Sequence, residues 1–287
     1  MTINVLICAF SSADLLALQI KAIRKFLPKS EVTVVIDQHY FPLYSGNSGY
    51  KLRRNMIKTS RKLADNTIPF NQLHHLYRRR LFPSSSTSNS RNPSLRHADC
   101  LQQGTQHIMT KNQNPILILD EDMIPFTRIL PEDLVGAKEK ILFLSQERTV
   151  DKVKIKYPWP GLFFFDPRFT VENIRISWDA ERVNGVNLDS GGGMHYWLQQ
   201  NSKLAKEVVG LSSNSWDYQD YLDIFPRDLY SFFELDKELG SGKQFCELYL
   251  LKFLHMRAAS NWIGHDPEFA NRRLKLFVDS INKLLDK

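Results

Sequence analysis

Long apolar runs are missing from this sequence. No stretch approaches the roughly 20 apolar residues that a membrane-spanning helix needs. The first residues, MTINVLICAFSSADLLALQ, carry no basic region ahead of their apolar stretch, which breaks at Ser11-Ser12. We therefore expect a first strand and a first helix here, and not a signal peptide.

Cysteine is also scarce. Cys8, Cys100 and Cys246 are odd in number and far apart, which fits neither a disulfide framework nor a zinc site. The simplest expectation is a reducing, cytoplasmic compartment. The chain of 287 residues shows no internal repeat and no clean linker, so we predict a single domain over 1–287.

Acidic residues are almost absent from one segment. Residues 51–96 hold eleven Lys or Arg against one acid, Asp65, a charge of +10, so the rest of the +7 chain carries −3. Such a segment indicates an anionic partner such as a diphosphate, a lipid headgroup or nucleic acid. A solvated basic face explains the same composition.

What is present at the start is a β-α-β pattern. Residues 3–10 and 31–38 have strand character, and 13–28 have apolar residues at helical spacing. This pattern predicts a parallel pair of strands with a right-handed crossover. Residues 39–95 lose clear periodicity and form an insertion, in which 82–94 are rich in Ser, Asn and Pro.

Periodicity returns at residue 93. We predict a helix over 93–112 with Ser94 as its cap. Four further elements follow: strands at 115–119, 140–146 and 161–166, and a buried helix within 244–256. A basic amphipathic helix over about 267–286 ends the chain. The fold class is therefore α/β, with a mostly parallel central sheet flanked by helices.

The most informative stretch is NPILILDEDMIPF, residues 114–126. A strand that looks buried runs directly into Asp120-Glu121-Asp122. Ligands of parallel α/β sheets bind at the carboxyl ends of strands. In an extended segment Asp120 and Asp122 point together and Glu121 points away, and a divalent cation would relieve their repulsion. The alternative is a purely structural role, in which one Asp caps a helix that starts at Ile124.

The segment ILILDEDM, preceded by SLRHADCLQQGTQHIM, resembles the Asp-x-Asp strand end of A-type glycosyltransferases, which use nucleotide-diphosphate sugars. NVLICAFSS and TVVIDQ resemble the first two strands of that Rossmann-like fold. The resemblance implies a nucleotide-binding half over 1–126, including the insertion 39–95, and a sugar and acceptor half over 127–287.

The resemblance also implies roles for individual residues. Phe10 and Ser12 would line the nucleoside pocket, and Asp37 would accept hydrogen bonds from base or ribose. Arg96 would lie near the phosphates with Asp120. On the cation side, the metal ligands would be Asp120, Asp122 and a late histidine, His255, with Mn²⁺ or Mg²⁺ as the ion. A satisfied interior histidine is the alternative reading of His255.

The second half supplies candidates for the sugar and the acceptor. Arg257 would meet the diphosphate, and Asn261-Trp262 would shape its pocket. Asp189, before three consecutive glycines, would hold sugar hydroxyls or act as the base, and Asp220 is a rival carboxylate. A tight turn with a capping Asp explains the Asp189 segment equally well.

The function predicted from the sequence is transfer of a sugar from a UDP- or GDP-linked donor to a hydroxyl of a glycan, lipid-linked or protein-linked acceptor. Inverting and retaining outcomes both remain open. A sugar-nucleotide nucleotidyltransferase is one alternative, although FSSADLL lacks the Gly-rich, basic loop of that class. A nucleic-acid-binding protein that uses residues 51–96 is another, but it leaves the acid cluster unexplained, so no nucleic acid is expected. Peripheral contact of the basic insertion and the last helix with a membrane surface is a third possibility.

Overall fold

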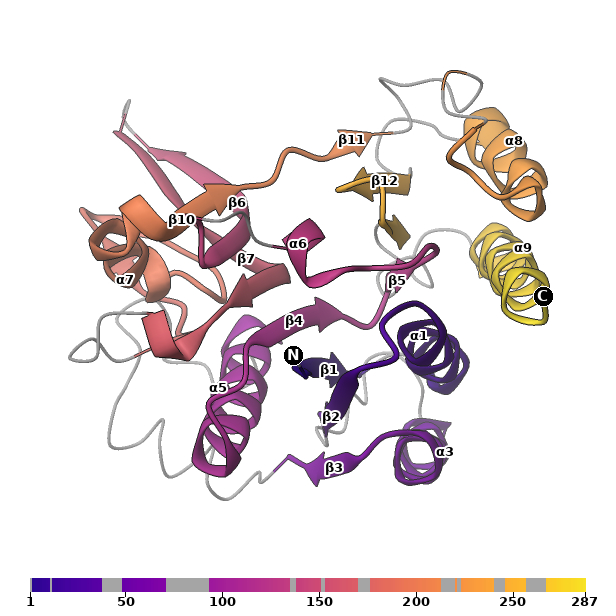
Figure 1. Ribbon diagram of the computed structural model, residues 1–287, viewed down its shortest axis with the longest axis horizontal. Coiled ribbons are helices and arrows are strands. Elements are labelled where there is room, and N and C mark those ends of the chain that lie inside the picture. Colours follow the sequence, from indigo (N-terminus) through magenta and orange to yellow (C-terminus); the bar gives the residue numbers. More distant parts are fainter. Residues whose placement is uncertain are drawn as a thin grey trace.

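The computed structural model describes residues 2–10, 12–37, 48–70, 93–134, 138–150, 153–169, 176–212, 220, 223–239, 246–256 and 267–287. Within these residues one seven-stranded sheet lies at the centre, with helices on both of its faces (Figure 1). Its strands are β1 (Ile3–Ala9), β2 (Ser30–Ile36), β3 (Asn66–Pro69), β4 (Ile116–Asp120), β6 (Ile141–Val150), β7 (Val153–Phe165) and β10 (Ala205–Glu207). The predicted α/β class is confirmed.

The sheet is mostly parallel. Its spatial order is β10-β6-β7-β4-β1-β2-β3, and β7 alone among these strands runs antiparallel to its neighbours. The strands predicted at 140–146 and 161–166 are the two arms of the long β6–β7 hairpin. Because β1, β2 and β4 are parallel and in register, their carboxyl ends meet at one edge of the sheet. A ligand site is expected at that edge.

The predicted β-α-β start is confirmed. Helix α1 (Ala13–Phe26) connects β1 to β2, and the hydroxyl oxygen of Ser12 caps it by accepting the Leu15 N–H at 3.2 Å. The helix ends two residues before Pro28, which cannot continue the hydrogen-bond ladder.

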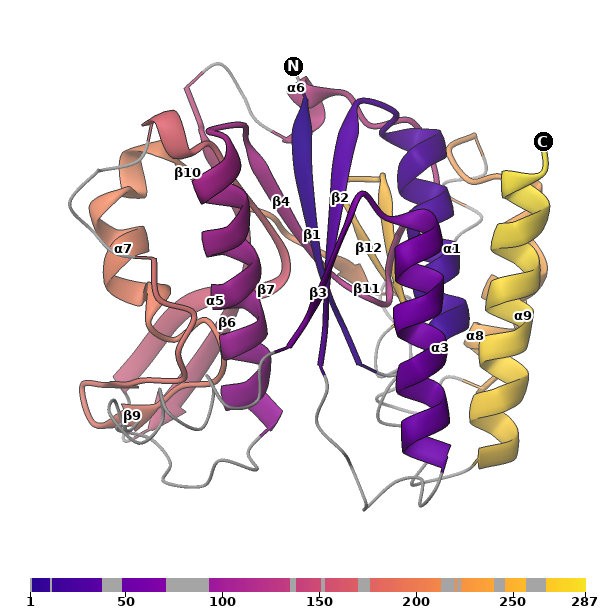
Figure 2. The same ribbon diagram turned by 90° about the horizontal axis from the view of Figure 1, so that it is seen from below.

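Alternate side chains of β1 reach two different cores. Val5 and Ile7 pack with Leu16 of α1, while Leu6 and Cys8 pack with Leu101 of α5 (Pro93–Lys111). Figure 2 shows the two helical layers, with α5 and α7 (Met194–Gln200) on one side and α1 and α3 (Ser48–Leu63) on the other. A strand covered on both faces explains why its sequence is uninterruptedly apolar.

The insertion 39–95 contains more structure than its sequence suggests. Helix α3 and strand β3 both lie within it, although no periodicity was recognised there. Among residues 51–63 of α3, Met56 and Ser60, one turn apart, are buried. Most of its basic residues, such as Lys58 and Arg61, are exposed, and Arg53 is half-buried, so the basic composition of this helix belongs mainly to its solvent face. Arg78-Arg79-Arg80 lie outside the described residues.

The prediction of a buried helix within 244–256 is wrong. Residues 246–256 form a hairpin, β12 (Cys246–Tyr249) and β13 (Phe253–Met256). Leu250 and Leu251 have φ of 56° and 54° and make its turn. An uninterrupted apolar run does not distinguish a buried helix from a buried strand. The hairpin belongs to a four-stranded sheet in the order β11-β12-β13-β5, where β5 is Met123–Pro125 and β11 is Leu211–Ser212.

Strand β5 also excludes a helix starting at Ile124, the structural alternative for the acid cluster. The predicted C-terminal amphipathic helix is confirmed as α9 (Pro267–Leu285). Its buried residues Phe277 and Ile281 pack in a third core with α1 and α8 (Tyr230–Leu239). Among the described helices, none combines the length and the apolar content that crossing a bilayer requires.

The remaining elements are short. They are α6 (Pro131–Leu134), η1 (Pro167–Phe169), β8 (Arg182–Val183), β9 (Val186–Asn187), η2 (Ser202–Leu204) and η4 (Arg227–Leu229).

Candidate functional site

The acid cluster lies at the carboxyl end of β4, as predicted. Asp120 is the last residue of β4, and Glu121 and Asp122 form a turn before β5 begins at Met123. Glu121 points away from its two neighbours and accepts the backbone N–H of Phe10 at 2.8 Å. The cluster is therefore divided as the sequence suggested, with the middle acid tied to the end of β1.

The backbone of this turn is held by a buried amide. Gln19 of α1 donates its side-chain N–H groups to the carbonyl oxygens of Asp120 at 2.6 Å and Met123 at 2.8 Å. The N–H of Met256 donates to the carbonyl oxygen of Asp122 at 3.1 Å. These hydrogen bonds hold the backbone of the turn, so they also fix the backbone positions from which the two aspartate side chains extend.

His255 faces Asp122, as the resemblance implied. Strand β13 pairs with β5 so that His255 lies opposite Met123, and its Nε2 is 3.4 Å from Asp122 Oδ1. Its Nδ1 is 2.7 Å from a carboxylate oxygen of Glu247 on β12. Burial lowers the pKa of His255, but the negative charges of Asp122 and Glu247 outweigh burial and raise it to about 10.

A second histidine, which the sequence analysis did not single out, faces the other aspartate. His97 of α5 has its Nε2 3.4 Å from Asp120 Oδ1 and its Nδ1 3.3 Å from the Ser190 hydroxyl oxygen. Burial and the charge of Asp122 raise the pKa of Asp120, while His97 and His255 act in the opposite direction. The only sequence signal for His97 was its position beside Arg96.

The donors form two aspartate–histidine pairs. Within the described residues no three His, Cys, Asp or Glu side chains already converge on one point suited to a metal ion. The residues nevertheless fit a divalent cation in donor type and in charge. Adjacent ligands of an octahedral cation bound at ~2.1 Å stand about 3 Å apart, close to the 3.4 Å within each pair. A cation would also favour the ionised form of Asp120, whose pKa is raised by burial and by the charge of Asp122.

The residues predicted to hold the nucleotide lie near the ends of the first strands. Phe10 follows β1 and is 41% exposed, so its ring is open to a ligand. Asp37 follows β2 and lies 3.5 Å from the guanidinium of Arg96, which is buried. Burial lowers the pKa of Arg96, and Asp37 opposes that shift. Ser12 uses its hydroxyl oxygen to cap α1.

Asp189 does not point at the acid cluster. Its carboxylate is 3.5 Å from Arg148 of β6 and accepts the backbone N–H of Ser190 at 3.1 Å. The next residue along the chain, Ser190, is the one that reaches His97. The Gly-rich segment is thus brought to the site, but through a hydroxyl that the sequence analysis passed over.

Several predicted residues cannot be placed in the site. Asp220 is described and exposed, but its neighbours on both sides lie outside the described residues. Arg257, Asn261 and Trp262 also lie outside them.

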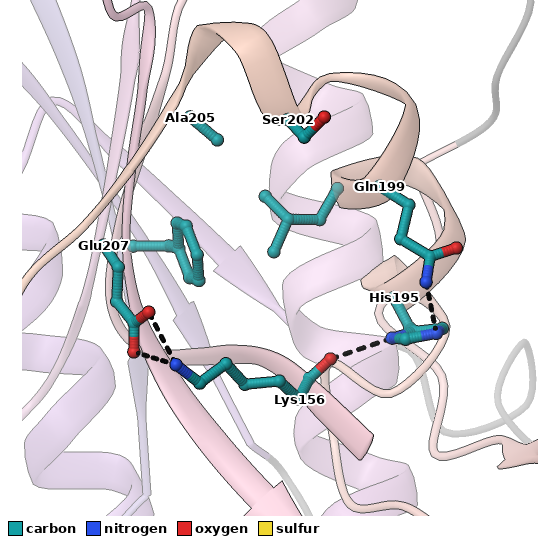
Figure 3. Close-up of a pocket in the computed structure, with 8 residues that line it drawn as sticks. Lys156, His195, Gln199, Ser202, Ala205 and Glu207 are labelled. Atoms are coloured by element: carbon teal, nitrogen blue, oxygen red, sulfur yellow. Dashed lines mark hydrogen bonds and ion pairs between the residues drawn. The ribbon is translucent and has the colours of Figure 1, made fainter. Parts of the chain in front are cut away.

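A separate concavity of about 360 Å³ lies beside the outer strand of the large sheet (Figure 3). Several of its labelled polar groups interact with one another: Lys156 pairs with Glu207 at 2.7 Å, and His195 contacts the Lys156 carbonyl oxygen at 2.8 Å. It is lined by Phe143, Lys156, His195, Leu198, Gln199, Ser202, Ala205 and Glu207, none of them a predicted site residue.

The chain matches no protein-family model, and no curated protein matches its sequence. Several solved structures are similar to it, among them the following three. LgtC, a galactosyltransferase solved with donor and acceptor sugar analogs, is 12% identical with a TM-score of 0.34, over 57% of this chain and 58% of LgtC. The PaToxG glycosyltransferase is 12% identical with a TM-score of 0.32, over 69% of each chain. S. aureus TarS is 13% identical with a TM-score of 0.30, over 53% of this chain and 23% of TarS.

The chain thus spans less than two thirds of LgtC and about a quarter of TarS. Every TM-score lies below 0.5, so the functional proposal rests on the residues of the chain itself.

Proposed function

We propose that the protein is a metal-dependent glycosyltransferase of the A type, which moves a sugar from a nucleotide-diphosphate donor to a hydroxyl acceptor. The observation that carries the proposal is the pair Asp120 and Asp122 at the carboxyl end of β4, each with a histidine Nε2 at 3.4 Å. Parallel sheets bind ligands at this edge, and a cation there would relieve the repulsion between the two carboxylates.

Asp120, Asp122 and His255 would hold Mn²⁺ or Mg²⁺, which when bound would stabilise the departing diphosphate as a Lewis acid. Glu247 fixes the imidazole of His255 by accepting its Nδ1–H, as carboxylates behind metal-binding histidines do. An imidazole ligand favours Mn²⁺ over Mg²⁺.

The donor nucleotide would occupy the ends of β1 and β2. The exposed ring of Phe10 offers a stacking surface for the base, and Asp37 offers acceptors for base or ribose hydrogen-bond donors. Arg96 lies beside Asp37, where its guanidinium would meet the diphosphate. Ser12 and Arg257 remain proposed contacts on the grounds of the resemblance alone, and so does a UDP- or GDP-linked donor.

The acceptor hydroxyl, on a glycan, a lipid-linked or a protein-linked substrate, would approach from the Gly-rich segment. In an inverting reaction Asp189 would have to leave Arg148 to take the acceptor proton. A retaining reaction needs no such base, and Asp189 would then hold sugar hydroxyls. Asp220 stays the alternative carboxylate.

A nucleotidyltransferase would also bind a nucleotide and a cation at such a site. The two functions differ in what they consume: incubation with a nucleoside triphosphate and a sugar phosphate would release pyrophosphate only in the nucleotidyltransferase. A panel of UDP- and GDP-sugars screened for Mn²⁺-dependent hydrolysis tests the glycosyltransferase directly.

Binding of the cation is tested by thermal unfolding with UDP or GDP, with and without Mn²⁺. We expect the wild type to be stabilised only when nucleotide and Mn²⁺ are both present, because ligand binding to the native state raises the melting temperature. Asp122→Ala should lose this stabilisation. Asp223→Ala, at an exposed aspartate, should retain it. A wild type that responds to neither nucleotide with Mn²⁺ would contradict the proposal.

A further inference from the structure

His97 lies between two segments that are far apart in the sequence. Its Nδ1 is 3.3 Å from the hydroxyl oxygen of Ser190 in the Gly-rich segment, and its Nε2 is 3.4 Å from Asp120 Oδ1 at the end of β4. The Nε2 atom is buried and has no hydrogen bond in the described structure. One imidazole therefore spans the gap between the two predicted halves of the site.

The two partners of His97 determine which of its ring nitrogens carries the proton. A carboxylate only accepts hydrogen bonds, so a lone pair on Nε2 would repel Asp120, whereas an N–H at Nε2 attracts it. With the proton on Nε2, Nδ1 is an acceptor, and the Ser190 hydroxyl is its donor. The order is then Ser190 O–H to Nδ1, and Nε2–H toward Asp120.

Ser190 is held rigidly, so it can fix the imidazole. The next residue, Gly191, has φ of +93° and donates its N–H to the Trp178 carbonyl oxygen at 2.8 Å. A Cβ on Gly191 would lie 2.3 Å from the Pro158 carbonyl oxygen, which shows how closely the backbone is packed there. The Ser190 side chain is itself buried.

The two contacts differ in kind. The Nδ1···Oγ contact of 3.3 Å is a long hydrogen bond, whereas Nε2, 3.4 Å from Asp120 Oδ1, makes none, and an unsatisfied buried donor is unfavourable. A small rotation of the Asp120 carboxylate toward Nε2 would satisfy this donor. His97 thus favours one orientation of the Asp120 carboxylate without being the group that binds the ligand.

We propose that His97 is a positioning residue for Asp120, fixed by Ser190, and that this relay links the Gly-rich segment to the acid cluster. The effect of this relay on cation binding rests on the proposed function. The relay parallels Glu247–His255–Asp122 on the other aspartate, with a neutral hydroxyl in place of the carboxylate. An event at the Gly-rich segment, such as sugar or acceptor binding, is then transmitted to the cation ligand Asp120.

Two amide variants separate the two contacts. His97→Gln places an amide N–H near the position of Nε2 and keeps the contact to Asp120, while His97→Asn places its amide near Nδ1 and keeps the contact to Ser190 alone. We expect His97→Asn to weaken Mn²⁺ affinity, measured by calorimetry, by about 10- to 100-fold, the usual effect of losing the group behind a metal ligand. His97→Gln should lose less than Asn, and Ser190→Ala should weaken affinity in the same direction as Asn.

His107→Gln and His107→Asn are the matched controls. His107 lies on the same helix, ten residues on, and its Nε2 is likewise buried without a hydrogen bond. These variants should bind Mn²⁺ as the wild type does. Equal Mn²⁺ affinity in wild type and His97→Asn, with affinity lost in Asp122→Ala, would overturn the relay and leave the proposed function standing.

Ring-nitrogen NMR of His97 without added cation tests the relay even if the wild type binds no Mn²⁺. We expect the proton on Nε2 in the wild type, and a shift toward the other tautomer in Ser190→Ala and in Asp120→Asn. A proton on Nδ1 in the wild type, or no response to either substitution, would overturn the inference independently of the proposed function.

Discussion

At the scale of single residues, the site depends on how buried charges are compensated. His255 is enclosed between Asp122 and Glu247, and the attraction of these carboxylates for a proton exceeds the cost of burying it. In the cation-free protein the imidazolium serves as the positive charge of the cluster. Losing that proton without gaining a cation leaves the carboxylates of Asp122 and Glu247 without a compensating positive charge, which is unfavourable.

This compensation predicts how stability depends on pH in the presence of a chelator. Because the pKa of His255 rises from 6.5 to about 10 on folding, its contribution is complete below pH 6.5 and is lost as the pH rises toward 10. Urea unfolding of the wild type should show falling stability across that window. His255→Gln should be less stable at pH 6.5 and should show a flatter profile. Parallel profiles for the two proteins would contradict this account.

At the scale of elements, the predicted helices and strands that were confirmed are those whose apolar spacing and end signals lie within the element itself. The first strand, helix and strand were predicted because their apolar spacing is unambiguous and Pro28 ends the helix. Helix α3 was missed because its apolar positions are few among many basic residues. The hairpin 246–256 was misassigned because its turn consists of two leucines in left-handed conformation, where the sequence carries no turn residue.

The site residues divide in the same way. Asp120 and Asp122 were predicted from the acid cluster at the end of a strand, and His255 from the resemblance to A-type glycosyltransferases. Ser190 and His97, 93 residues apart, meet only because the Gly-rich segment packs on β7, and no local pattern encodes that contact.

Two glycines with positive φ offer a comparison at the scale of elements. Gly185 (φ +81°) forms the Asn-Gly turn between β8 and β9, and a Cβ there would meet nothing within 4 Å. Gly185→Ala should therefore cost about 1–2 kcal/mol, the penalty of the left-handed conformation alone. Gly191→Ala should cost more, because its Cβ would also clash with the Pro158 carbonyl oxygen. Chemical unfolding of both variants measures the difference, and equal costs would show that the Gly191 backbone yields easily.

At the scale of the whole molecule, the large sheet and the smaller sheet are joined at the site. The acid turn leads from β4 in the first to β5 in the second, so both aspartates lie where the two sheets meet. Helix α9 packs in the third core together with residues of the smaller sheet. It also contacts two other helices: Phe277 packs against Phe232 of α8, and Lys25 of α1 donates to the carbonyl oxygen of Leu285. With its apolar face buried, α9 could meet a membrane only through its basic face.

Phe277→Ala tests the packing of α9. The side chain is fully buried, so truncation should lower the free energy of unfolding by about 3–5 kcal/mol. Lys275→Ala, on the exposed face of the same helix, should be nearly neutral. Urea unfolding of the two variants provides the measurement. A loss below 1 kcal/mol for Phe277→Ala would mean that α9 is dispensable for the third core.

The pairing of β5 with β13 also has a consequence for the order of events during synthesis. A ribosome can complete β4 and the turn after it, which carry Asp120 and Asp122, long before it reaches His255. His255 must then close a very long loop to reach its place beside β5. The emerging chain can bury its first layers and place His97 beside Asp120 while Asp122 still lacks its histidine partner, His255. Under the proposed function, the ability to bind a cation should therefore appear late and in one step, when the hairpin of β12 and β13 docks against β5.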